Sequence, residues 1–410
     1  MTYFYDTCAL LNKQSGILNS FFYISNISLK ELENIKTSNT KDESTKYTAR
    51  KIIKMLDDNE DMYKVIDYDK KWDIQLANYS VLPETNDSKI ILCALDASRK
   101  VEDLIFCTDD ICCKRLAIDL GLQVQYIKDK LDDYKGYREV RLNEDEMAEF
   151  YQHKPDQAKK LKMINNEYLI VRDADGKVVD KLKAKDGVFE EVGFPCFESQ
   201  QYGKVKPKDV YQEIAMDSLK NNKITMLAGP AGSGKSYLAM AYMMTALEKG
   251  AIDHIIIVCN PIATRGAAKL GFYPGDKDCK LLDSQIGNFL NSKFGDAFRV
   301  ESLIDNGKII LIPLSDLRGY DTSGMNACIY MTESQNTDID LMKLVLQRTG
   351  DDCKVIIEGD YSTQVDSAYY AGVNNGMKRA SEVFRGHNCY GQVNLQSIWR
   401  SEIAEIAEQM

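Results

Sequence analysis

The sequence predicts an α/β protein with a parallel-sheet domain at each end and a small β-rich unit between them. Short apolar segments alternate with amphipathic helical segments over residues 1–135, and the same alternation returns over residues 204–410. Between these parts, residues 136–203 include a stretch in which apolar and polar residues alternate around two Asp-Gly pairs, a pattern typical of β-hairpins. Alternating strands and helices build parallel sheets that are covered by helices. We therefore expect three parts, with boundaries near residues 135 and 203.

The N-terminal domain is expected to contain strands and helices whose ends carry acidic residues. Residues 1–7 (MTYFYDT) and 103–110 (DLIFCTDD) have the pattern of strands. Residues 28–37 (SLKELENIKT) and 88–98 (SKIILCALDAS) have the pattern of helices. Ligands of a parallel sheet gather where its strands end. Residues 132–162 are charged and weakly patterned, which predicts a domain boundary.

The C-terminal domain is expected to contain five strands, and the middle unit is expected to fold as hairpins over residues 166–192. The five strand candidates are residues 224–230 (ITMLAGP), 254–261 (HIIIVCNP), 308–314 (KIILIPL), 327–333 (ACIYMTE) and 353–360 (CKVIIEGD).

The first of these strands runs into a glycine-rich loop that is followed by a helical segment. The loop is GPAGSGKS, which comprises Gly229, Pro230, Ala231, Gly232, Ser233, Gly234, Lys235 and Ser236. Its glycines let backbone N–H groups turn toward phosphate oxygens, Lys235 supplies a positive charge for the β- and γ-phosphates, and Ser236 supplies a hydroxyl for Mg²⁺. The alternative is a glycine-rich turn that binds nothing. The complete eight-residue pattern between a strand and a helix favours an ATP site.

Polar residues near the ends of later segments supply the other groups that such a site needs. Glu333 ends one strand, where it can activate a water molecule. Asp360 and Gln364 follow another strand and can sense the γ-phosphate, and Arg400 can reach a phosphate in its own chain or across a subunit interface. The alternative for each is an ordinary solvated position.

The N-terminal domain has single carboxylates at the ends of several segments, namely Asp6, Glu31, Asp87 and Asp110. Clustered carboxylates repel one another unless a divalent cation neutralises them, so a cluster here would be a Mg²⁺ or Mn²⁺ site. Metal-bound water can then cleave a phosphodiester. Asp6 and Asp87 also precede helical segments, so both have an alternative role as helix caps. Composition alone leaves the two readings open.

Composition excludes several other classes of protein. The apolar fraction is 44% and the charged fraction is 28%, as in ordinary globular proteins. No apolar run reaches the ~20 residues of a membrane helix, and we expect no N-terminal leader. The eleven cysteines are scattered, which favours a reducing cytoplasm, and three histidines without a Cys-x-x-Cys pair argue against zinc. The net charge of −10 argues against a general nucleic-acid coat.

From about Lys206 to its end, the chain resembles the PhoH-like ATPases, relatives of superfamily 1 helicases with a RecA-like P-loop fold. The resemblance is carried by VYQEIAMDSL, GPAGSGKS, NP, KLGFYPGD, LRG, ESQN, GDYSTQVD and WRSEIAEIA. It implies that Gln212 reads adenine. The chain departs from the family at Thr332, where an Asp normally precedes the catalytic Glu, at Asn260, where the family normally starts this motif with Arg, and at Tyr320-Asp321, where the family has Arg-Thr. We expect the Thr332 hydroxyl to hold a metal-bound water and Asp360 to restore part of the lost charge. Because the rest of that charge is missing, we expect a working ATPase that needs more Mg²⁺, and Thr332→Asp should lower this requirement.

Residues 3–125 resemble a PIN-domain endoribonuclease. The resemblance is carried, in order, by YDTCALL, SLKELENIK, NDSKIILCAL and TDDICCKRLA. It implies that Asp6, Glu31, Asp87 and Asp110 are metal ligands and that the neighbouring Asp109 could substitute. Basic residues could contact the RNA backbone, or could simply be solvated on helix faces, namely Lys89, Lys114 and Arg115.

Together the two resemblances imply an ATP-dependent RNA-processing enzyme that cuts single-stranded RNA in one domain and moves or unwinds it with the other. Arginines acting in trans would imply a homo-oligomer, a hexameric ring in view of the family. The alternative is an ATP-binding scaffold for RNA or protein with weakened catalysis, which Thr332 keeps open. A metabolite kinase is disfavoured by the long helicase-like segment after Asp360.

Overall fold

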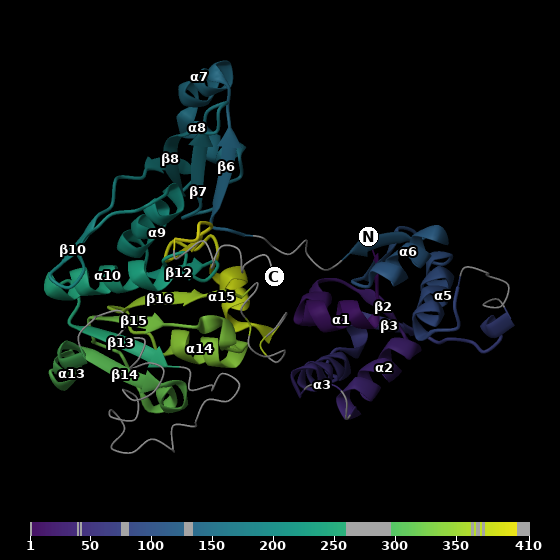
Figure 1. Cartoon of the computed structure of the whole chain (residues 1–410). Coiled ribbons are helices and arrows are strands. Elements are labelled where there is room, and N and C mark those ends of the chain that lie inside the picture. The colour runs from purple at the N-terminus through teal and green to yellow at the C-terminus, as the bar shows by residue number, and fades with distance from the viewer. Residues whose placement is uncertain are drawn as a thin grey trace. The chain divides into compact units, whose positions relative to one another are not determined.

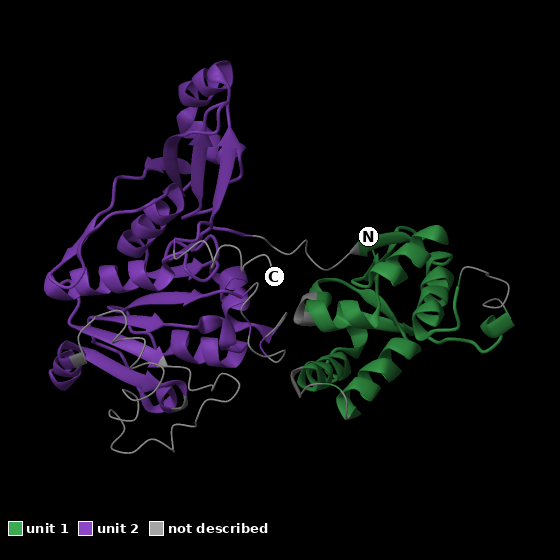
Figure 2. Ribbon diagram, in the orientation of Figure 1, with its two compact units in different colours: residues 1–133 green, residues 134–410 purple. Residues whose placement is uncertain are grey.

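The computed structural model describes residues 2–38, 41, 43–74, 82–126, 134–259, 297–361, 365, 370 and 374–399. The chain divides into two compact units, residues 1–133 and residues 134–410, which are considered separately (Figure 2).

Unit 1 is a parallel sheet with helices on both faces. The strand order is β3-β2-β1-β4-β5, with β1 at Thr2–Tyr5, β2 at Phe22–Ser25, β3 at Tyr63–Ile66, β4 at Leu104–Thr108 and β5 at Gln123–Tyr126. The helices are α1 (Thr7–Lys13), α2 (Asn26–Thr37), α3 (Glu43–Asp57), α5 (Asn86–Ser98) and α6 (Ile111–Asp119), with short 3₁₀ segments at Gln14–Asn19 and Glu60–Met62.

Two separate apolar cores hold this sheet because neighbouring side chains of a strand point to opposite faces. Phe4 on β1 lies opposite Phe106 on β4, and both pack in the core that includes α5 and α6. The next residues, Tyr5 and Cys107, are also paired and pack in the other core, with residues of α1, α2 and α3.

Unit 2 is built on a six-stranded parallel sheet with the order β14-β13-β15-β16-β12-β17 (Figure 1). The strands are β12 (Ile224–Ala228), β13 (His254–Cys259), β14 (Ile309–Pro313), β15 (Ala327–Met331), β16 (Lys354–Gly359) and β17 (Tyr390–Asn394). One face packs with α9 (Val210–Asn221), α10 (Lys235–Glu248) and α13 (Ala297–Asp305), and the other packs with α14 (Ile339–Gln347) and α15 (Gly376–Phe384). Short 3₁₀ segments lie at Leu314–Gly319 and Ser334–Asn336. All five predicted strands of this region are present, and β17 is an addition.

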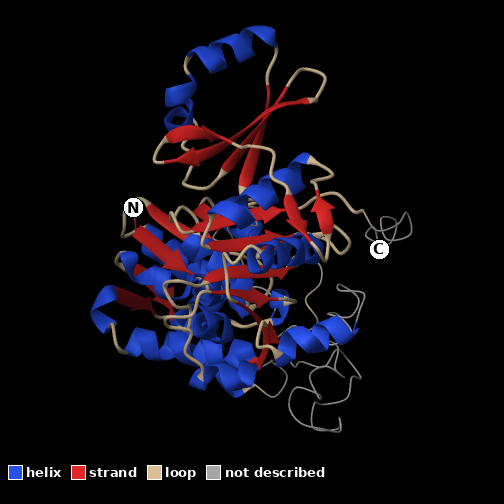
Figure 3. Cartoon of the chain, turned by 90° about the vertical axis from the view of Figure 1, so that its left-hand side faces the viewer, coloured by secondary structure: helices blue, strands red, loops and turns tan. Residues whose placement is uncertain are grey.

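A smaller four-stranded sheet forms the first part of unit 2. Its order is β6-β7-β8-β9, with β6 at Tyr137–Arg141, β7 at Tyr168–Arg172, β8 at Val178–Lys185 and β9 at Val188–Glu191. β6 and β7 are parallel, and β7, β8 and β9 form the antiparallel hairpins expected around the Asp-Gly turns. Figure 3 shows these strands in red with blue helices beside them. A short antiparallel pair, β10 (Phe197–Ser199) and β11 (Gly203–Val205), follows.

The charged segment 132–162 contains regular structure as well as the division between the units. After β6 come α7 (Glu144–Gln152) and α8 (Lys154–Lys160). A capping box starts α7, because Asn143 and Glu146 each accept a hydrogen bond from the other's backbone N–H. Local capping therefore supports a helix whose apolar pattern is weak.

The small sheet is tied to the large one by polar contacts. The Tyr168 hydroxyl donates to Asp217 on α9 at 2.8 Å, and the Asn166 side chain donates to the backbone oxygen of Tyr390 on β17 at 2.9 Å. Of the helices in the described part of the chain, none is long and apolar enough to cross a membrane.

Candidate functional site

The glycine-rich loop connects the end of β12 to the start of α10. Three of its glycines have a left-handed backbone, with φ of 130° at Gly229, 81° at Gly232 and 95° at Gly234. A Cβ atom at Gly229 would lie 2.3 Å from the backbone oxygen of Leu395, so no larger residue fits there without movement. Gly234 precedes α10 without a capping side chain, and the N-terminus of a helix attracts anions.

Lys235 lies along this loop. Its ammonium donates to the backbone oxygens of Gly229, at 2.6 Å, and of Pro230, at 2.9 Å. The Ser233 hydroxyl donates to the same Pro230 oxygen at 2.8 Å. The positive charge that the sequence assigns to phosphate binding is thus held at the loop itself.

Gln212, on α9, supports the loop from the side. Its amide nitrogen donates to the Ser233 backbone oxygen at 3.1 Å, and its amide oxygen accepts from the Lys208 backbone N–H at 3.0 Å. An amide group has two donors and two acceptor lone pairs, so one of each is left for a further partner. An adenine edge needs one donor and one acceptor, which is compatible with the role that the resemblance implies.

Trp399 lies against the same loop and is the first residue of the WRSEIAEIA segment, although no role was assigned to its side chain from the sequence. Its backbone N–H donates to the Gly232 oxygen at 3.0 Å, and its indole N–H donates to Asp209 at 3.1 Å. The Lys208 ammonium lies 5.2 Å from its ring centre, and 43% of the side chain is exposed.

The polar ends of β15 and β16 are joined by one buried side chain, Gln335. Its amide nitrogen donates to the Glu333 carboxylate at 2.6 Å, and its amide oxygen accepts from the Asp360 backbone N–H at 3.3 Å. Glu333 is exposed and has a left-handed backbone, with φ of 51°. Such strain in a residue other than glycine is concentrated at functional sites.

A further acid, Glu358, points toward the loop. One of its carboxylate oxygens accepts hydrogen bonds from the Ser236 hydroxyl at 2.9 Å and from the Thr332 hydroxyl at 3.2 Å. Its side chain is only 3% exposed. Burial raises its pKa, and the charge of Lys235 opposes that shift. The available signal in the sequence was an acid that interrupts the apolar run of β16 one residue before its end.

Several predicted site residues lie outside the part of the chain that the structure describes. These are Gln364, Arg400, Asn260 and residues 269–276.

In unit 1, Asp6 is buried directly after β1. One carboxylate oxygen accepts from the Ala9 backbone N–H at 2.6 Å, as in a helix cap, and the other accepts from the Thr108 hydroxyl. Burial raises the pKa of Asp6 to about 7, although these two hydrogen bonds oppose the shift; the charges of Asp109 and Asp87 raise it further. Asp6 therefore caps α1, and the charges of neighbouring acids also raise its pKa.

Glu31 and Asp87 lie near each other at the same edge of the sheet. Glu31 accepts from the Thr7 hydroxyl at 2.5 Å and from the Asn86 amide at 2.8 Å. Desolvation, then the charges of Glu31 and Asp110, raise the pKa of Asp87. The cap of α5 is Thr85, whose hydroxyl accepts from the Ser88 N–H, so the capping alternative is wrong for Asp87.

Asp110 caps α6 by accepting from the Cys113 backbone N–H at 2.8 Å. All four acids influence one side chain, Cys8. Desolvation and the charges of Asp6, Asp110, Asp87 and Glu31 raise its pKa to about 12, although its side chain still reaches solvent. The charges of the four predicted acids thus all act on the Cys8 thiol. Over the described ranges, no group of three or more His, Cys, Asp and Glu side chains is arranged to hold a metal ion.

The basic residues considered for RNA contact have other neighbours. The Lys89 ammonium lies 5.7 Å from the ring centre of Tyr68, and Arg115 pairs with Asp119 on α6 at 3.4 Å. The Asn12 amide donates to Asp109 at 2.5 Å, so a hydrogen bond also orients the carboxylate next to Asp110 in the sequence.

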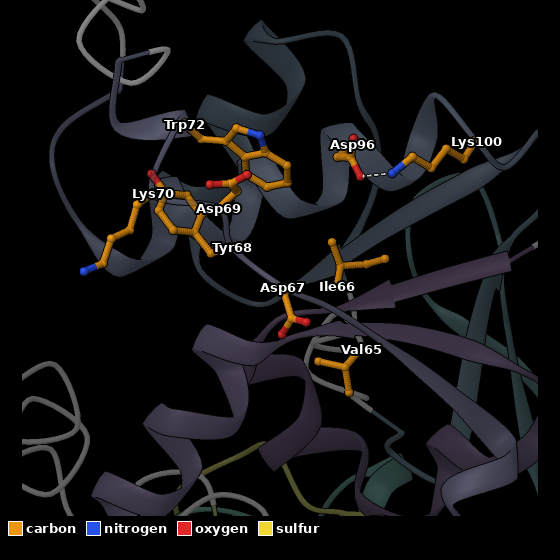
Figure 4. Close-up of a pocket in the computed structure, with 9 residues that line it drawn as sticks. All are labelled: Val65, Ile66, Asp67, Tyr68, Asp69, Lys70, Trp72, Asp96 and Lys100. Atoms are coloured by element: carbon orange, nitrogen blue, oxygen red, sulfur yellow. Dashed lines mark hydrogen bonds and ion pairs between the residues drawn. The ribbon is translucent and has the colours of Figure 1, made fainter.

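A cavity of about 700 Å³ lies beside the end of β3 (Figure 4). Its lining includes the side chains of Tyr68 and Trp72, which meet edge to face, and the ion pair of Asp96 with Lys100. None of the four acids lines it.

Two family models match the chain, PhoH-like protein over residues 204–410 and PIN domain over residues 3–128. "Protein PhoH2" of Bacillus subtilis is 26% identical over 350 residues, which is 80% of this chain and 78% of that protein. A PhoH-like protein of Mycobacterium tuberculosis is 33% identical over 181 residues, 44% of this chain and 49% of the relative. A crystal structure of VapBC2 from Rickettsia felis bound to a promoter DNA fragment matches 30% of this chain and 98% of that chain, at 19% identity and a TM-score of 0.21.

Proposed function

Because the chain belongs to the PhoH-like proteins and has a PIN domain before its PhoH region, we propose that it is an ATP-dependent RNA-processing enzyme. In this proposal unit 2 hydrolyses ATP and works as a helicase-like motor, and unit 1 is a metal-dependent endoribonuclease for single-stranded RNA. The observation that carries the proposal is that each unit gathers its own polar site where its parallel strands end.

In unit 2, the loop residues are assigned to the phosphates. Lys235 and the first N–H groups of α10 would bind the phosphate charge. Ser236 and Glu358 offer hard oxygen ligands, the type that Mg²⁺ prefers, so the residues present fit this ion. Bound Mg²⁺ would neutralise charge on the phosphates. Glu333 would orient the attacking water, and its hydrogen bond from Gln335 would keep its carboxylate in place.

In unit 1, the four acids are assigned to a Mg²⁺ or Mn²⁺ site. The fit rests on their chemistry, since repulsion among carboxylates around Cys8 favours a divalent cation. Such an ion would supply a water that attacks phosphodiesters. Hydrogen bonds from Thr7, Asn86 and Thr108 would hold Glu31 and Asp6 in orientation.

The protein would act as a homo-oligomeric ring, a hexamer, and Arg400 would reach a phosphate in its own chain or in a neighbouring subunit. Mass photometry of the full chain with and without ATP tests this assembly. Free thiols at the described cysteines suit a reducing cytoplasm, where we place the protein.

The direct test incubates the full-length protein with end-labelled single-stranded RNA and follows RNA fragments and released phosphate together. We expect cleavage that needs Mg²⁺ or Mn²⁺ and stops with EDTA, and phosphate release that needs ATP and Mg²⁺. ATP binding without turnover, combined with intact RNA under all of these conditions, would support the scaffold alternative instead.

A further inference from the structure

We propose that Glu358 supplies, from β16, the cation-holding carboxylate that the chain does not place at Thr332, directly after β15. This inference rests on the proposed function, because it assumes that the loop binds ATP with Mg²⁺. It assigns a role at the ATP site to a residue outside the motif that normally carries that acid.

The order of the strands makes this substitution geometrically reasonable. β16 lies between β12, which carries the phosphate loop, and β15, which ends before Thr332 and Glu333. In the β12–β16 register, Glu358 lies opposite Leu227, one residue before the end of the strand. An acid at this position can therefore contact both neighbouring strand ends. It does so through the hydrogen bonds from Ser236 and Thr332.

The Ser236 contact connects Glu358 to the site of the ion. Ser236 follows Lys235 at the start of α10, and its hydroxyl is the loop group suited to Mg²⁺. That hydroxyl lies 2.9 Å from the Glu358 carboxylate. Thr332 contributes a neutral hydroxyl to the same carboxylate oxygen, so the negative charge at this place comes from β16 instead of β15.

The second carboxylate oxygen of Glu358 provides independent support. It is buried and makes no hydrogen bond of good geometry in the described part of the chain, where the Tyr330 hydroxyl is its polar neighbour. Burying a carboxylate without full compensation is costly. A divalent cation beside the loop would compensate that charge, whereas a purely structural acid would be expected to have both oxygens satisfied.

The position of Glu358 also revises what Thr332→Asp should do. From the sequence alone, an added acid there should lower the Mg²⁺ requirement. In the structure, however, the Thr332 hydroxyl is 3.2 Å from the Glu358 carboxylate, so an Asp would place two carboxylates side by side. Since Glu358 already supplies the charge that Thr332 lacks, the added acid would repel Glu358 without replacing a missing charge. Exchange of both residues, Thr332→Asp with Glu358→Thr, avoids this conflict.

The test measures ATP affinity by calorimetry on the full chain, first in EDTA and then across a Mg²⁺ titration. We expect Glu358→Gln to weaken Mg²⁺-dependent ATP binding by about 10–100-fold and to leave the affinity in EDTA unchanged. The double exchange should recover most of the Mg²⁺ dependence, and Thr332→Asp alone should not increase it. Mn²⁺ binding in the presence of ATP, followed by electron paramagnetic resonance, gives a second readout that does not depend on turnover.

Glu167→Gln is the matched control. Glu167 is also 3% exposed, but it lies before β7 and pairs with Arg138 at 3.0 Å. This variant should bind ATP and Mg²⁺ as the wild type does. A loss of binding in Glu358→Gln alone would then be due to the position of the acid beside the loop and not to the removal of a buried acid.

The outcomes separate the inference from the function on which it rests. If the wild type binds ATP with Mg²⁺ and folded Glu358→Gln shows the same Mg²⁺ dependence, Glu358 does not hold the ion and the proposed ATPase survives. If the wild type itself does not bind ATP with Mg²⁺, both are overturned. If Glu358→Gln does not fold, the double exchange decides: recovery of Mg²⁺-dependent binding supports the relocation of the acid, and failure of a folded double exchange to bind opposes it.

Discussion

Thr332 and Glu333 are adjacent, yet the fold gives them different surroundings. Thr332 directs its hydroxyl to the buried Glu358, whereas Glu333 is exposed and bound to Gln335. The left-handed backbone of Glu333 directs its side chain independently of β15. In the proposed assignment, an acid on β16 holds the ion and an acid that follows β15 activates the water.

Glu333→Gln should therefore stop hydrolysis and preserve ATP binding. The amide keeps the size of the side chain but cannot accept a proton from the attacking water. We expect the turnover number to fall by about 10²–10⁴-fold, with the affinity for ATP within a few-fold of the wild type. Phosphate release and calorimetry on the same preparation measure both quantities. Wild-type turnover in this variant would remove Glu333 from the catalytic role.

At the scale of single elements, the residue that caps α5 differs from the residue of its first turn that is assigned to the metal site. Thr85 caps this helix, and Asp87 lies in its first turn near Glu31 and Asp110. Thr85→Ala should lower the free energy of unfolding of unit 1 by about 1 kcal/mol. Asp87→Asn should not lower it, because the raised pKa of Asp87 indicates that its charged form is disfavoured in the folded state.

Urea unfolding followed through Trp72 measures this difference. The chain has two tryptophans, so a Trp399→Phe background restricts the signal to unit 1. A larger loss of stability in Asp87→Asn than in Thr85→Ala would mean that Asp87 has a structural role instead.

The contact between Trp399 and the loop gives a second test at this scale. Because its backbone binds Gly232 and its ring lies beside Lys208, ATP binding at the loop should change its indole fluorescence. The Trp72→Phe variant isolates this signal, and Trp399→Phe should lose it. Calorimetric ATP binding with unchanged Trp399 emission would show that this contact does not respond to the nucleotide.

The sequence predicted elements with strong apolar patterns and missed those held by polar contacts. The five strands of the large sheet follow from apolar runs. β17 was not predicted because Gln392 interrupts its apolar run. That side chain is buried and donates to the Tyr134 backbone oxygen at 2.7 Å. Glu358 was missed for another reason. Its contacts depend on which strands are neighbours, and the insertion of β16 between β12 and β15 is a property of the folded sheet.

At the scale of the whole molecule, each unit has its own cores and its own polar site. The four acids of unit 1 belong to segments spread over residues 6–110, and the charges of all four act on Cys8. The PIN and PhoH family matches fall on these two units in the same order. A substitution in the proposed nuclease site of unit 1 should therefore leave ATP hydrolysis intact, and a substitution in the proposed ATP site of unit 2 should leave RNA cleavage intact.

The most direct measurement of this account is a crossed assay on the full chain. Wild type, Asp6→Asn with Asp87→Asn, Lys235→Ala and the combined variant are each given end-labelled single-stranded RNA, ATP and Mg²⁺, and both RNA fragments and released phosphate are followed. We predict that the paired Asp variant loses cleavage and keeps phosphate release, and that Lys235→Ala loses phosphate release and keeps metal-dependent cleavage of unstructured RNA. Wild-type cleavage by the paired Asp variant, or wild-type phosphate release by folded Lys235→Ala, would contradict the assignment of the two sites.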